Sequence, residues 1–235
     1  MYSIIIPAYN EERRIKRTLE DYYAYLRSKK PGFEIIVVSD GNDGTGDIVK
    51  NFARSRNNVR LFQFAGRLGK GGAVLEGFKR AHGSIVGFTD ADGSVGPEDF
   101  YKILKEAEHV DCSIASRRIS GARVVENVIL KRRILSFLFM AFVNTLFFLG
   151  VKDTQCGAKA FRKETIRVIL NNTRTRGFEF DAEVLWHVKR NGYTIREVPV
   201  TWRHSDYSSF KIRNTVTMFF NLLRIRFSAR RRRVI

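Results

Sequence analysis

Short apolar runs alternate with segments of helical hydrophobic spacing through the N-terminal part of the chain. The runs at residues 2–6, 33–38, 59–64 and 85–89 have the length and β-branched composition of buried strands. Between them, apolar residues recur every three or four positions, as in amphipathic helices. Asn10, followed by two acids, is predicted to cap the first helix. Four strand–helix alternations predict an α/β fold, with a Rossmann-like, mostly parallel sheet covered by helices on both faces.

Each of these strands ends in a polar or glycine-rich loop. Because the carboxyl ends of parallel strands lie along one edge of a sheet, Asp40, Lys70, Asp90 and Asp92 are expected to share one crevice. Two carboxylates as close as Asp90 and Asp92 repel each other unless a cation or a donor lies between them. A hard divalent ion that carries a diphosphate would satisfy both. A solvated turn is the alternative, and the glycine loop at residues 69–71 lacks the spacing of a Walker motif.

The rest of the chain continues the alternation. Further helices and strands are predicted at residues 97–107, 110–116, 165–170, 177–188 and 193–202. Proline near its first position suits the start of the helix at residue 97, and Pro199 marks the strand at 193–202 as an edge strand.

A strongly apolar run at residues 134–150 follows three basic residues. It is shorter than the ~20 residues that a spanning helix needs. A span would also place the later part of the same domain on the opposite side of the membrane. We therefore predict that residues 124–151 form helices that lie in the membrane interface, with a core hairpin as the alternative.

The C-terminal segment predicts a basic amphipathic helix. Its apolar face is formed by Val216, Phe219, Phe220, Leu223 and Phe227. Arginines surround this face, which is typical of a helix that binds a membrane surface; an arginine tail on a core helix is the alternative. The chain is thereby divided into a domain of residues 1–211 and a membrane-surface helix of residues 212–235.

The composition of the chain limits the classes of partner that it is expected to bind. The net charge of +18 and the pI near 10.3 predict an anionic partner, which is a nucleic acid, an acidic membrane surface or a phosphorylated ligand. Two cysteines are too few for a disulfide framework and fit a reducing cytosol. The chain starts directly with a strand, so no signal peptide is expected. These features predict a peripheral protein on the cytoplasmic face of a membrane, without a transmembrane span.

Six motifs, in this order, resemble those of inverting family 2 glycosyltransferases with the GT-A fold. They are Pro7-Ala8-Tyr9-Asn10-Glu11, Asp40-Gly41-Asn42-Asp43-Gly44-Thr45, Gly69-Lys70-Gly71, Asp90-Ala91-Asp92, Asp153-Thr154-Gln155-Cys156-Gly157 and Phe180-Asp181-Ala182-Glu183. The last two resemble the branch that acts on polyprenyl phosphates, which includes the dolichyl-phosphate glucosyl- and mannosyltransferases. One departure is Ser39, where the family commonly has a second acid before its glycine, and the loop is one residue shorter before Asp43.

The resemblance implies a role for each motif. Nucleotide-sugar contacts are implied for Pro7, Tyr9, Glu11, Asp40, Lys70, Asp90, Ala91, Asp92 and Lys211. A Mg²⁺ or Mn²⁺ ion would be held by Asp90, Asp92 and Ser94. The acceptor phosphate would be bound by Arg117, Arg132 and Ser136. The implied catalytic residues are Asp92 and Asp153, the latter as a base or as a positioning group.

The implied activity is metal-dependent, inverting transfer of one sugar from a nucleotide sugar to dolichyl or another polyprenyl phosphate. The Gln-x-x-Arg-Trp motif of processive synthases is absent from the sequence, which favours a single transfer. The motif at residues 153–157 resembles the glucosyl branch more than the mannosyl branch, so UDP-glucose is favoured over GDP-mannose. Another acceptor is the alternative within the family. A basic nucleic-acid-binding protein is the alternative from a different class, and the sequence carries no nucleic-acid motif.

Overall fold

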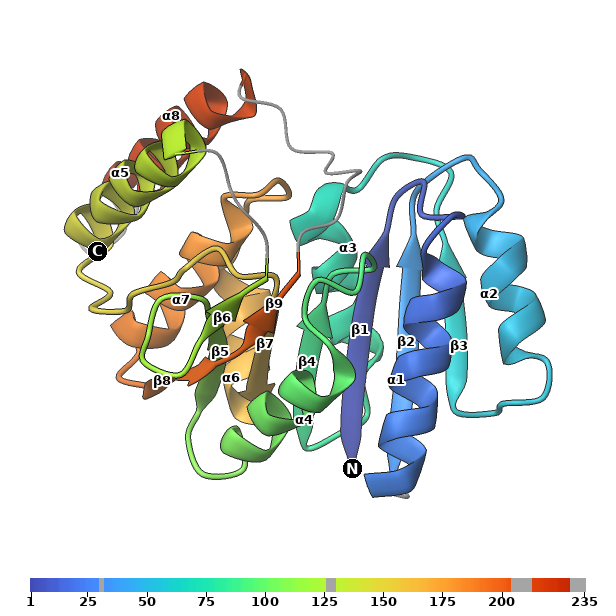
Figure 1. The fold of residues 1–235 in the computed structure, drawn as a ribbon. Coiled ribbons are helices and arrows are strands. Elements are labelled where there is room, and N and C mark those ends of the chain that lie inside the picture. Colours follow the sequence, from blue (N-terminus) through green and yellow to red (C-terminus); the bar gives the residue numbers. More distant parts are fainter. Residues whose placement is uncertain (30–31, 126–129, 204–212, 229–235) are drawn as a thin grey trace.

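The computed structural model describes residues 1–29, 32–125, 130–203 and 213–228, without the side chains of residues 130–135, 213–217 and 228. A central sheet of seven strands runs through the described chain in the order β3-β2-β1-β4-β7-β5-β8 (Figure 1). The strands are β1 (Tyr2–Ala8), β2 (Phe33–Ser39), β3 (Val59–Gln63), β4 (Ile85–Thr89), β5 (Cys112–Ser116), β7 (Ala158–Arg162) and β8 (Ile195–Pro199). All neighbours pair in parallel except β7, which is antiparallel to both β4 and β5. The mostly parallel sheet predicted from the sequence is therefore confirmed.

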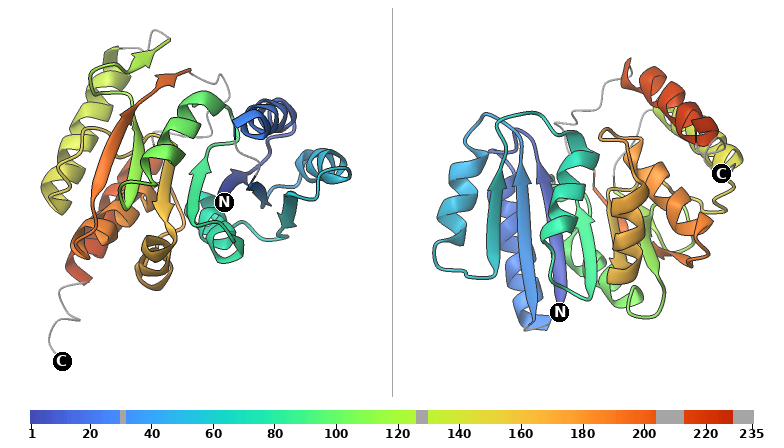
Figure 2. Two further views of the ribbon diagram at one scale, coloured as in Figure 1. Left: turned by 90° about the horizontal axis from the view of Figure 1, so that it is seen from below. Right: turned by 180° about the vertical axis from the view of Figure 1, so that it is seen from behind.

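Helices cover both faces of this sheet, as expected for buried strands (Figure 2). The helices that pack on it are α1 (Ile15–Lys29), α2 (Thr45–Ala53), α3 (Gly69–Arg80), α4 (Pro97–Glu106), α6 (Lys163–Asn172) and α7 (Phe180–Arg190). In β1, Ile4 and Ile6 belong to the core under α1, α2 and α4, whereas Ile5 belongs to the core under α3, α6 and α7. The period-two pattern of the strand thus supplies both cores.

Two helices lie side by side at one end of the molecule, beyond α7 (Figure 1). They are α5 (Leu130–Phe147) and α8 (Arg213–Ser228). In the chain, β6 (Arg123–Val124) precedes α5 and β9 (Thr201–Trp202) precedes α8. These two short strands pair with each other in a separate sheet. Val143 of α5 and Leu222 of α8 are buried in the core, and the rings of Phe142 and Phe219 stack with centroids 4.3 Å apart. The run predicted as interfacial therefore contains one helix, which packs on the domain along one side.

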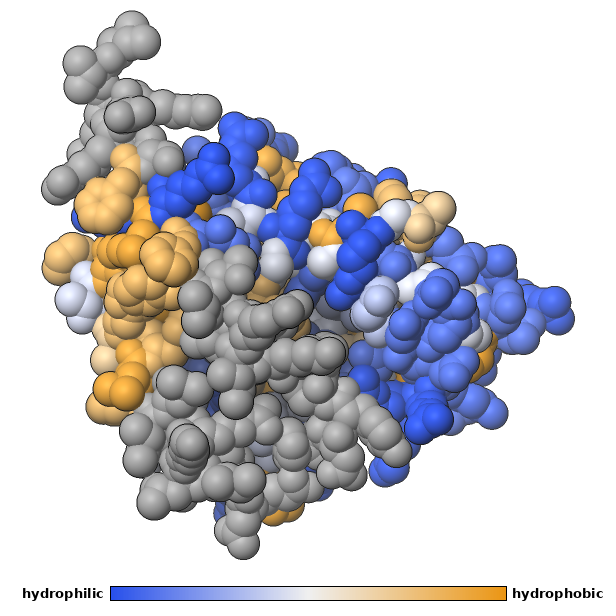
Figure 3. Space-filling view, turned by 90° about the horizontal axis from the view of Figure 1, so that it is seen from above, coloured by the Kyte–Doolittle hydropathy of each residue, from blue (hydrophilic) through white to orange (hydrophobic). Residues whose placement is uncertain are grey.

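The outward side of this helix pair carries large exposed apolar residues. We call this surface the outer apolar patch. It is formed by Phe137, Leu138, Phe148, Phe219, Phe220 and Phe227. Figure 3 shows hydrophobic side chains gathered at this end of the molecule, next to hydrophilic ones. Among the described residues, no helix combines the length and the hydropathy needed to cross a bilayer.

Two local predictions are wrong. Asn10 does not cap a helix: it has a left-handed φ of 55°, its Oδ1 accepts a hydrogen bond from the Asn42 backbone N–H, and α1 begins only at Ile15. The predicted strand at residues 193–202 is divided into β8 and β9, which belong to different sheets. Its first part is an edge strand, as Pro199 indicated.

Candidate active site

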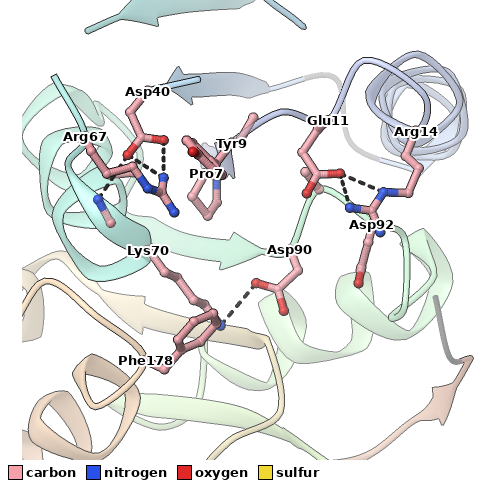
Figure 4. A pocket seen from close by; sticks show the side chains of 14 residues that line it. Pro7, Tyr9, Glu11, Arg14, Asp40, Arg67, Lys70, Asp90, Asp92 and Phe178 are labelled. Atoms are coloured by element: carbon pink, nitrogen blue, oxygen red, sulfur yellow. Dashed lines mark hydrogen bonds and ion pairs between the residues drawn. The ribbon is translucent and has the colours of Figure 1, made fainter. Parts of the chain in front are cut away.

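A pocket opens at the carboxyl edge of the sheet, where β1, β2 and β4 end and α3 begins (Figure 4). It is lined by Pro7, Ala8, Tyr9, Glu11, Arg14, Asp40, Arg67, Gly69, Lys70, Ala73, Asp90, Ala91, Asp92 and Phe178. The structure thereby brings together every residue predicted to contact a nucleotide sugar except Lys211, which lies outside the described residues. Loops at the carboxyl ends of parallel strands account for this convergence.

One end of the pocket is built around Asp40. Its buried carboxylate accepts two hydrogen bonds from Nη1 of Arg67, at 2.6 and 2.7 Å, and others from the backbone N–H groups of Leu68 and Gly69. The Arg67 guanidinium lies 3.4 Å from the centroid of the Tyr9 ring. A planar cation on an aromatic face, fixed by a buried carboxylate, makes a flat surface of the kind on which an aromatic ring can stack. The sequence reasoning did not single out Arg67 as a site residue, although it belongs to the glycine-rich loop that was expected at residues 67–72.

Lys70 lines a further part of the pocket, near Asp90 (Figure 4). Its ammonium lies 3.1 Å from carboxylate oxygens of both Asp90 and Asp181. Asp181 in turn accepts a 2.5 Å hydrogen bond from Lys159, which is fully buried. Although burial opposes ionisation, Lys159 and Lys70 hold the pKa of Asp181 below its usual range. The two lysines and two carboxylates balance in charge, and together they hold the Lys70 ammonium in the pocket, where it can bind a phosphate of a nucleotide.

Lys159 and Asp181 are further site residues that the sequence reasoning missed. Asp181 lies inside a quoted motif, yet nothing in the motif shows that it pairs with a lysine far away in the chain. Lys159 stands between small apolar residues in β7, and a lysine inside a buried strand is a signal of a buried ion pair. That signal was present in the sequence and went unused.

The loop after β4 places Asp92 at the mouth of the pocket. Its Oδ1 accepts a hydrogen bond from the backbone N–H of Ser94 at 2.9 Å. Ser94 itself is buried and does not line the pocket, so the structure does not bring this predicted metal ligand to the site.

A divalent cation fits the residues at this mouth. Burial raises the pKa of Glu11 to about 7; Arg14 opposes this effect, and the negative charges of Asp92 and Asp90 add to it. The carboxylates therefore repel one another in the pocket. In the described part of the chain, no group of three or more His, Cys, Asp or Glu side chains could hold a metal alone. Mg²⁺ is commonly held by one or two carboxylates together with substrate phosphates, and Asp92 with a bound diphosphate would make that set.

The raised pKa of Glu11 predicts a pH-dependent stability. Below about pH 4.5 the carboxyl is protonated whether the chain is folded or not. Between about pH 4.5 and 7 only the unfolded chain releases the proton, so rising pH lowers the free energy of unfolding. Relative to Glu11→Gln, the wild type should lose about 1–2 kcal/mol across this window, allowing for solvent screening, and nothing further above it. Urea unfolding from pH 4 to 8 measures this, with Glu20→Gln on the exposed side of α1 as control; a constant difference between the wild type and Glu11→Gln would contradict it.

Gly157 sets the position of Asp90. A Cβ atom at residue 157 would lie 1.7 Å from Oδ2 of Asp90, so an alanine there must displace that carboxylate. Overpacking of this kind costs about 1–3 kcal/mol, and we expect Gly157→Ala to weaken nucleotide-sugar binding about tenfold or more. Isothermal titration calorimetry measures this. Gly66→Ala is the matched control, because a Cβ there meets nothing within 4 Å. Equal affinities for the two variants would show that Asp90 does not contact the ligand.

A second cluster lies beside the pocket at the end of β5. Arg117 donates hydrogen bonds to Asp153 from its backbone N–H, from Nε at 2.7 Å and from Nη2 at 3.0 Å. Its guanidinium also lies 5.4 Å from the Trp202 ring centroid. Arg118, which the sequence reasoning missed, donates a 2.8 Å hydrogen bond to Oγ of Ser136. The side chain of Arg132, the third predicted acceptor ligand, lies outside the described residues.

Asp153 is buried and saturated with donors. Besides Arg117, the backbone N–H groups of Gln155 and Cys156 donate to it. Although burial opposes ionisation, Arg117 holds the pKa of Asp153 below its usual range. A carboxylate with a lowered pKa and five donors is a weak proton acceptor. The geometry therefore suits Asp153 to orienting Arg117 rather than to removing a proton.

Comparison with known proteins connects these features to a family. The family model "Glycosyl transferase family 2" matches residues 3–170. A dolichyl-phosphate beta-glucosyltransferase of Dictyostelium discoideum is 34% identical over 241 residues, covering 96% of this chain and 73% of that protein. The dolichyl-phosphate beta-glucosyltransferase ALG5A of Trichomonas vaginalis is 33% identical, covering 95% of this chain and 72% of its own length. An undecaprenyl-phosphate mannosyltransferase of Micrococcus luteus is 31% identical, with 88% and 86% covered.

Solved structures share the fold. Glucosyl-3-phosphoglycerate synthase from Mycobacterium tuberculosis, in complex with uridine-diphosphate, superposes with a TM-score of 0.69 at 17% identity, covering 97% of this chain and 79% of that one. The same enzyme in complex with Mn²⁺ and uridine-diphosphate-glucose also gives a TM-score of 0.69. The fold is that of the GT-A glycosyltransferases. More particularly, the chain belongs to glycosyltransferase family 2, which confirms the family resemblance drawn from its motifs.

Proposed function

We propose that this protein transfers a single glucose from UDP-glucose to dolichyl or another polyprenyl phosphate, with inversion, in the presence of Mg²⁺ or Mn²⁺. The observation that carries this proposal is the pairing of two sites. The pocket around Tyr9, Asp40 and Lys70 suits a nucleoside diphosphate, and the arginine cluster of Arg117 and Arg118 beside it suits a phosphate acceptor. The names of relatives that match almost the whole chain support the sugar and the lipid phosphate.

Each group then has a chemical task. Tyr9, Asp40 and Arg67 hold the base, while Lys70 and Asp90 hold the ribose and the diphosphate. A bound divalent cation at Asp92 would neutralise charge on the leaving diphosphate. Arg117, oriented by Asp153, and Arg118 with Ser136 bind the lipid phosphate and turn one of its oxygens towards the anomeric carbon.

The proposed transfer forms one bond and breaks one bond, and it does not require a strong base. The lipid phosphate oxygen forms a bond to the anomeric carbon from the face opposite the diphosphate, and the bond to the diphosphate oxygen breaks with its electron pair. A phosphate monoester is largely ionised at neutral pH, because its second pKa is about 6. No proton must therefore be removed during attack, which agrees with the positioning role of Asp153.

The reaction is proposed to occur at a membrane surface on the cytoplasmic side. A polyprenyl chain remains in the bilayer, so the enzyme has to reach the phosphate at the interface. The outer apolar patch on α5 and α8 supports this location, and the positive charge of the chain suits an anionic leaflet. Under this proposal the anionic partners are a lipid surface and phosphorylated substrates, and no nucleic acid is required.

One assay decides the donor. The protein is incubated with dolichyl phosphate and a panel of labelled nucleotide sugars, and the label in the extracted lipid is counted. We expect label from UDP-glucose, one sugar per lipid. If only GDP-mannose labels the lipid, the proposed donor is wrong, whereas the proposed acceptor still holds. Label in no lipid, with intact metal-dependent nucleotide binding, would reject the polyprenyl phosphate acceptor.

A further inference from the structure

A second cavity, which shares no lining residue with the active-site pocket, lies between α6, α7 and α8, with a volume of about 810 Å³. Four arginines line it: Arg174, Arg176, Arg190 and Arg224. Within the described part of the chain none of these guanidiniums forms an ion pair; Arg190 lies over the Trp186 ring at 5.2 Å. Arginines rimming a cavity without carboxylate partners are suited to binding an oxyanion, phosphate above all.

The carboxylates of this cavity are engaged elsewhere. Glu183 accepts hydrogen bonds from the backbone N–H groups of Arg174 and Thr175, and from Oγ1 of Thr175. Glu179 accepts a hydrogen bond from Asn221 of α8. Both acids are buried, whereas the four arginines are exposed around the opening. The rim therefore presents positive charge, and the acids hold the loop and α8 in place.

The wall of the cavity also includes a buried histidine. His187 is only 7% exposed and lines the cavity, and among the described residues its Nε2 has no hydrogen-bond partner within 3.5 Å. Oε1 of Glu183 lies 3.6 Å from this nitrogen, within ion-pair distance of a protonated imidazole. His187 therefore adds a polar ring, held beside Glu183, to the wall of a cavity that arginines surround.

The position of the cavity on α8 identifies the kind of ligand. Asn221, Arg224 and Ile225 of α8 line it. Phe220 precedes Arg224 by one turn and Phe227 follows it by three residues, and both aromatic side chains point outward in the outer apolar patch. When that patch enters a bilayer, the rim of the cavity lies at the level of the lipid headgroups.

We propose that this cavity binds the phosphate of a phospholipid headgroup and thereby sets the orientation of the enzyme on the membrane. The inference rests on the proposed membrane attachment, and it assigns the attachment a specific lipid contact. A phosphomonoester headgroup offers the most charge and the most acceptors to the four arginines and to His187. The ligand is distinct from the polyprenyl phosphate, which reacts at the other cluster, around Arg117.

Vesicle sedimentation tests the site. The full chain is mixed with phosphatidylcholine vesicles that contain phosphatidic acid, or phosphatidylserine adjusted to the same surface charge. Arg174→Gln/Arg190→Gln should bind the phosphatidic acid vesicles about 30-fold more weakly than the wild type, because each basic residue lost at the surface accounts for about a fivefold change. Its loss on phosphatidylserine should be smaller. Arg54→Gln/Arg167→Gln removes the same charge from exposed positions, just after α2 and on α6, and should change little. The proposal is overturned if the two double variants lose vesicle binding equally, or if Arg174→Gln/Arg190→Gln loses binding equally on both lipids. Either result would show that the effect is due to surface charge alone.

A local readout separates a lipid from a soluble phosphate. In a ¹⁵N-histidine spectrum, the His187 signal is identified by its disappearance in His187→Gln. Short-chain phosphatidic acid should shift this signal in the wild type. Glycerol phosphate at the same concentration should not, and an equal shift would assign the cavity to a soluble phosphate. Transfer to a short, water-soluble polyprenyl phosphate is measured in parallel: its absence in the wild type rejects the proposed function, whatever the vesicles show.

Discussion

Asp92→Ala is expected to lower the rate of sugar transfer at least about a thousandfold, because a cation on a leaving diphosphate supplies several kcal/mol of charge stabilisation. Asp92 lies at the mouth of the pocket, and its Oδ1 accepts a hydrogen bond only from the local backbone among the bonds described. The substitution therefore removes a charge from the ligand space without breaking a core contact. The fold should remain intact, with an unchanged midpoint of urea unfolding.

Binding distinguishes a cation role from a structural one. In the wild type, calorimetry should show that Mn²⁺ strengthens UDP binding and that a chelator reverses the effect. In Asp92→Ala the affinity for UDP should be the same with and without Mn²⁺. Asp21→Ala, which removes an exposed carboxylate of α1, is the control and should behave as the wild type. Full turnover of the wild type in excess chelator would reject the prediction.

The N-terminal half of the sheet could be predicted because its information is local. Each of β1 to β4 is a short apolar run, and parallel crossover rules place consecutive units beside one another. The same rules gave the shared edge for Asp40, Lys70 and Asp90. The placement of β7 could not be read in this way. It lies between β4 and β5 and antiparallel to both, and it follows the long excursion through α5.

The ion pairs between residues far apart in the chain were the main feature of the site that the sequence did not predict. Arg67 with Asp40, and Lys159 with Asp181, bring together residues 27 and 22 positions apart, and no spacing rule selects such partners. The family resemblance assigned roles to Asp40 and Lys70, but it assigned none to Arg67 or Lys159. Asn10 shows the opposite error: local capping chemistry suggested a helix start, but the turn against Asn42 took precedence.

The sequence predicted only one of the two apolar sides of the C-terminal helix. The apolar face read from the spacing includes Phe220 and Phe227, which are exposed. A second apolar side, with Met218 and Leu222, is buried against the domain and was not recognised. Ending the chain after residue 211 would therefore uncover the core, and substitutions on the exposed side give the cleaner test of membrane attachment.

Phe137→Ser/Phe220→Ser/Phe227→Ser is expected to lower partitioning into anionic liposomes more than about a hundredfold, since transfer of even two phenylalanine side chains out of water is worth about 3 kcal/mol. These rings are 56%, 63% and 57% exposed, so their replacement leaves the core intact. UDP binding and transfer to a short, water-soluble polyprenyl phosphate should be retained, whereas transfer to long-chain dolichyl phosphate in liposomes should fall with the partitioning. The matched control replaces the same three residues by leucine, which keeps the patch apolar and should keep most of the binding. High salt weakens the contribution of the arginines but not that of the rings, so the difference between the serine and leucine variants should persist at high ionic strength. Unchanged liposome binding of the serine variant would show that α5 and α8 do not enter the bilayer, and would leave the basic residues alone as the means of attachment.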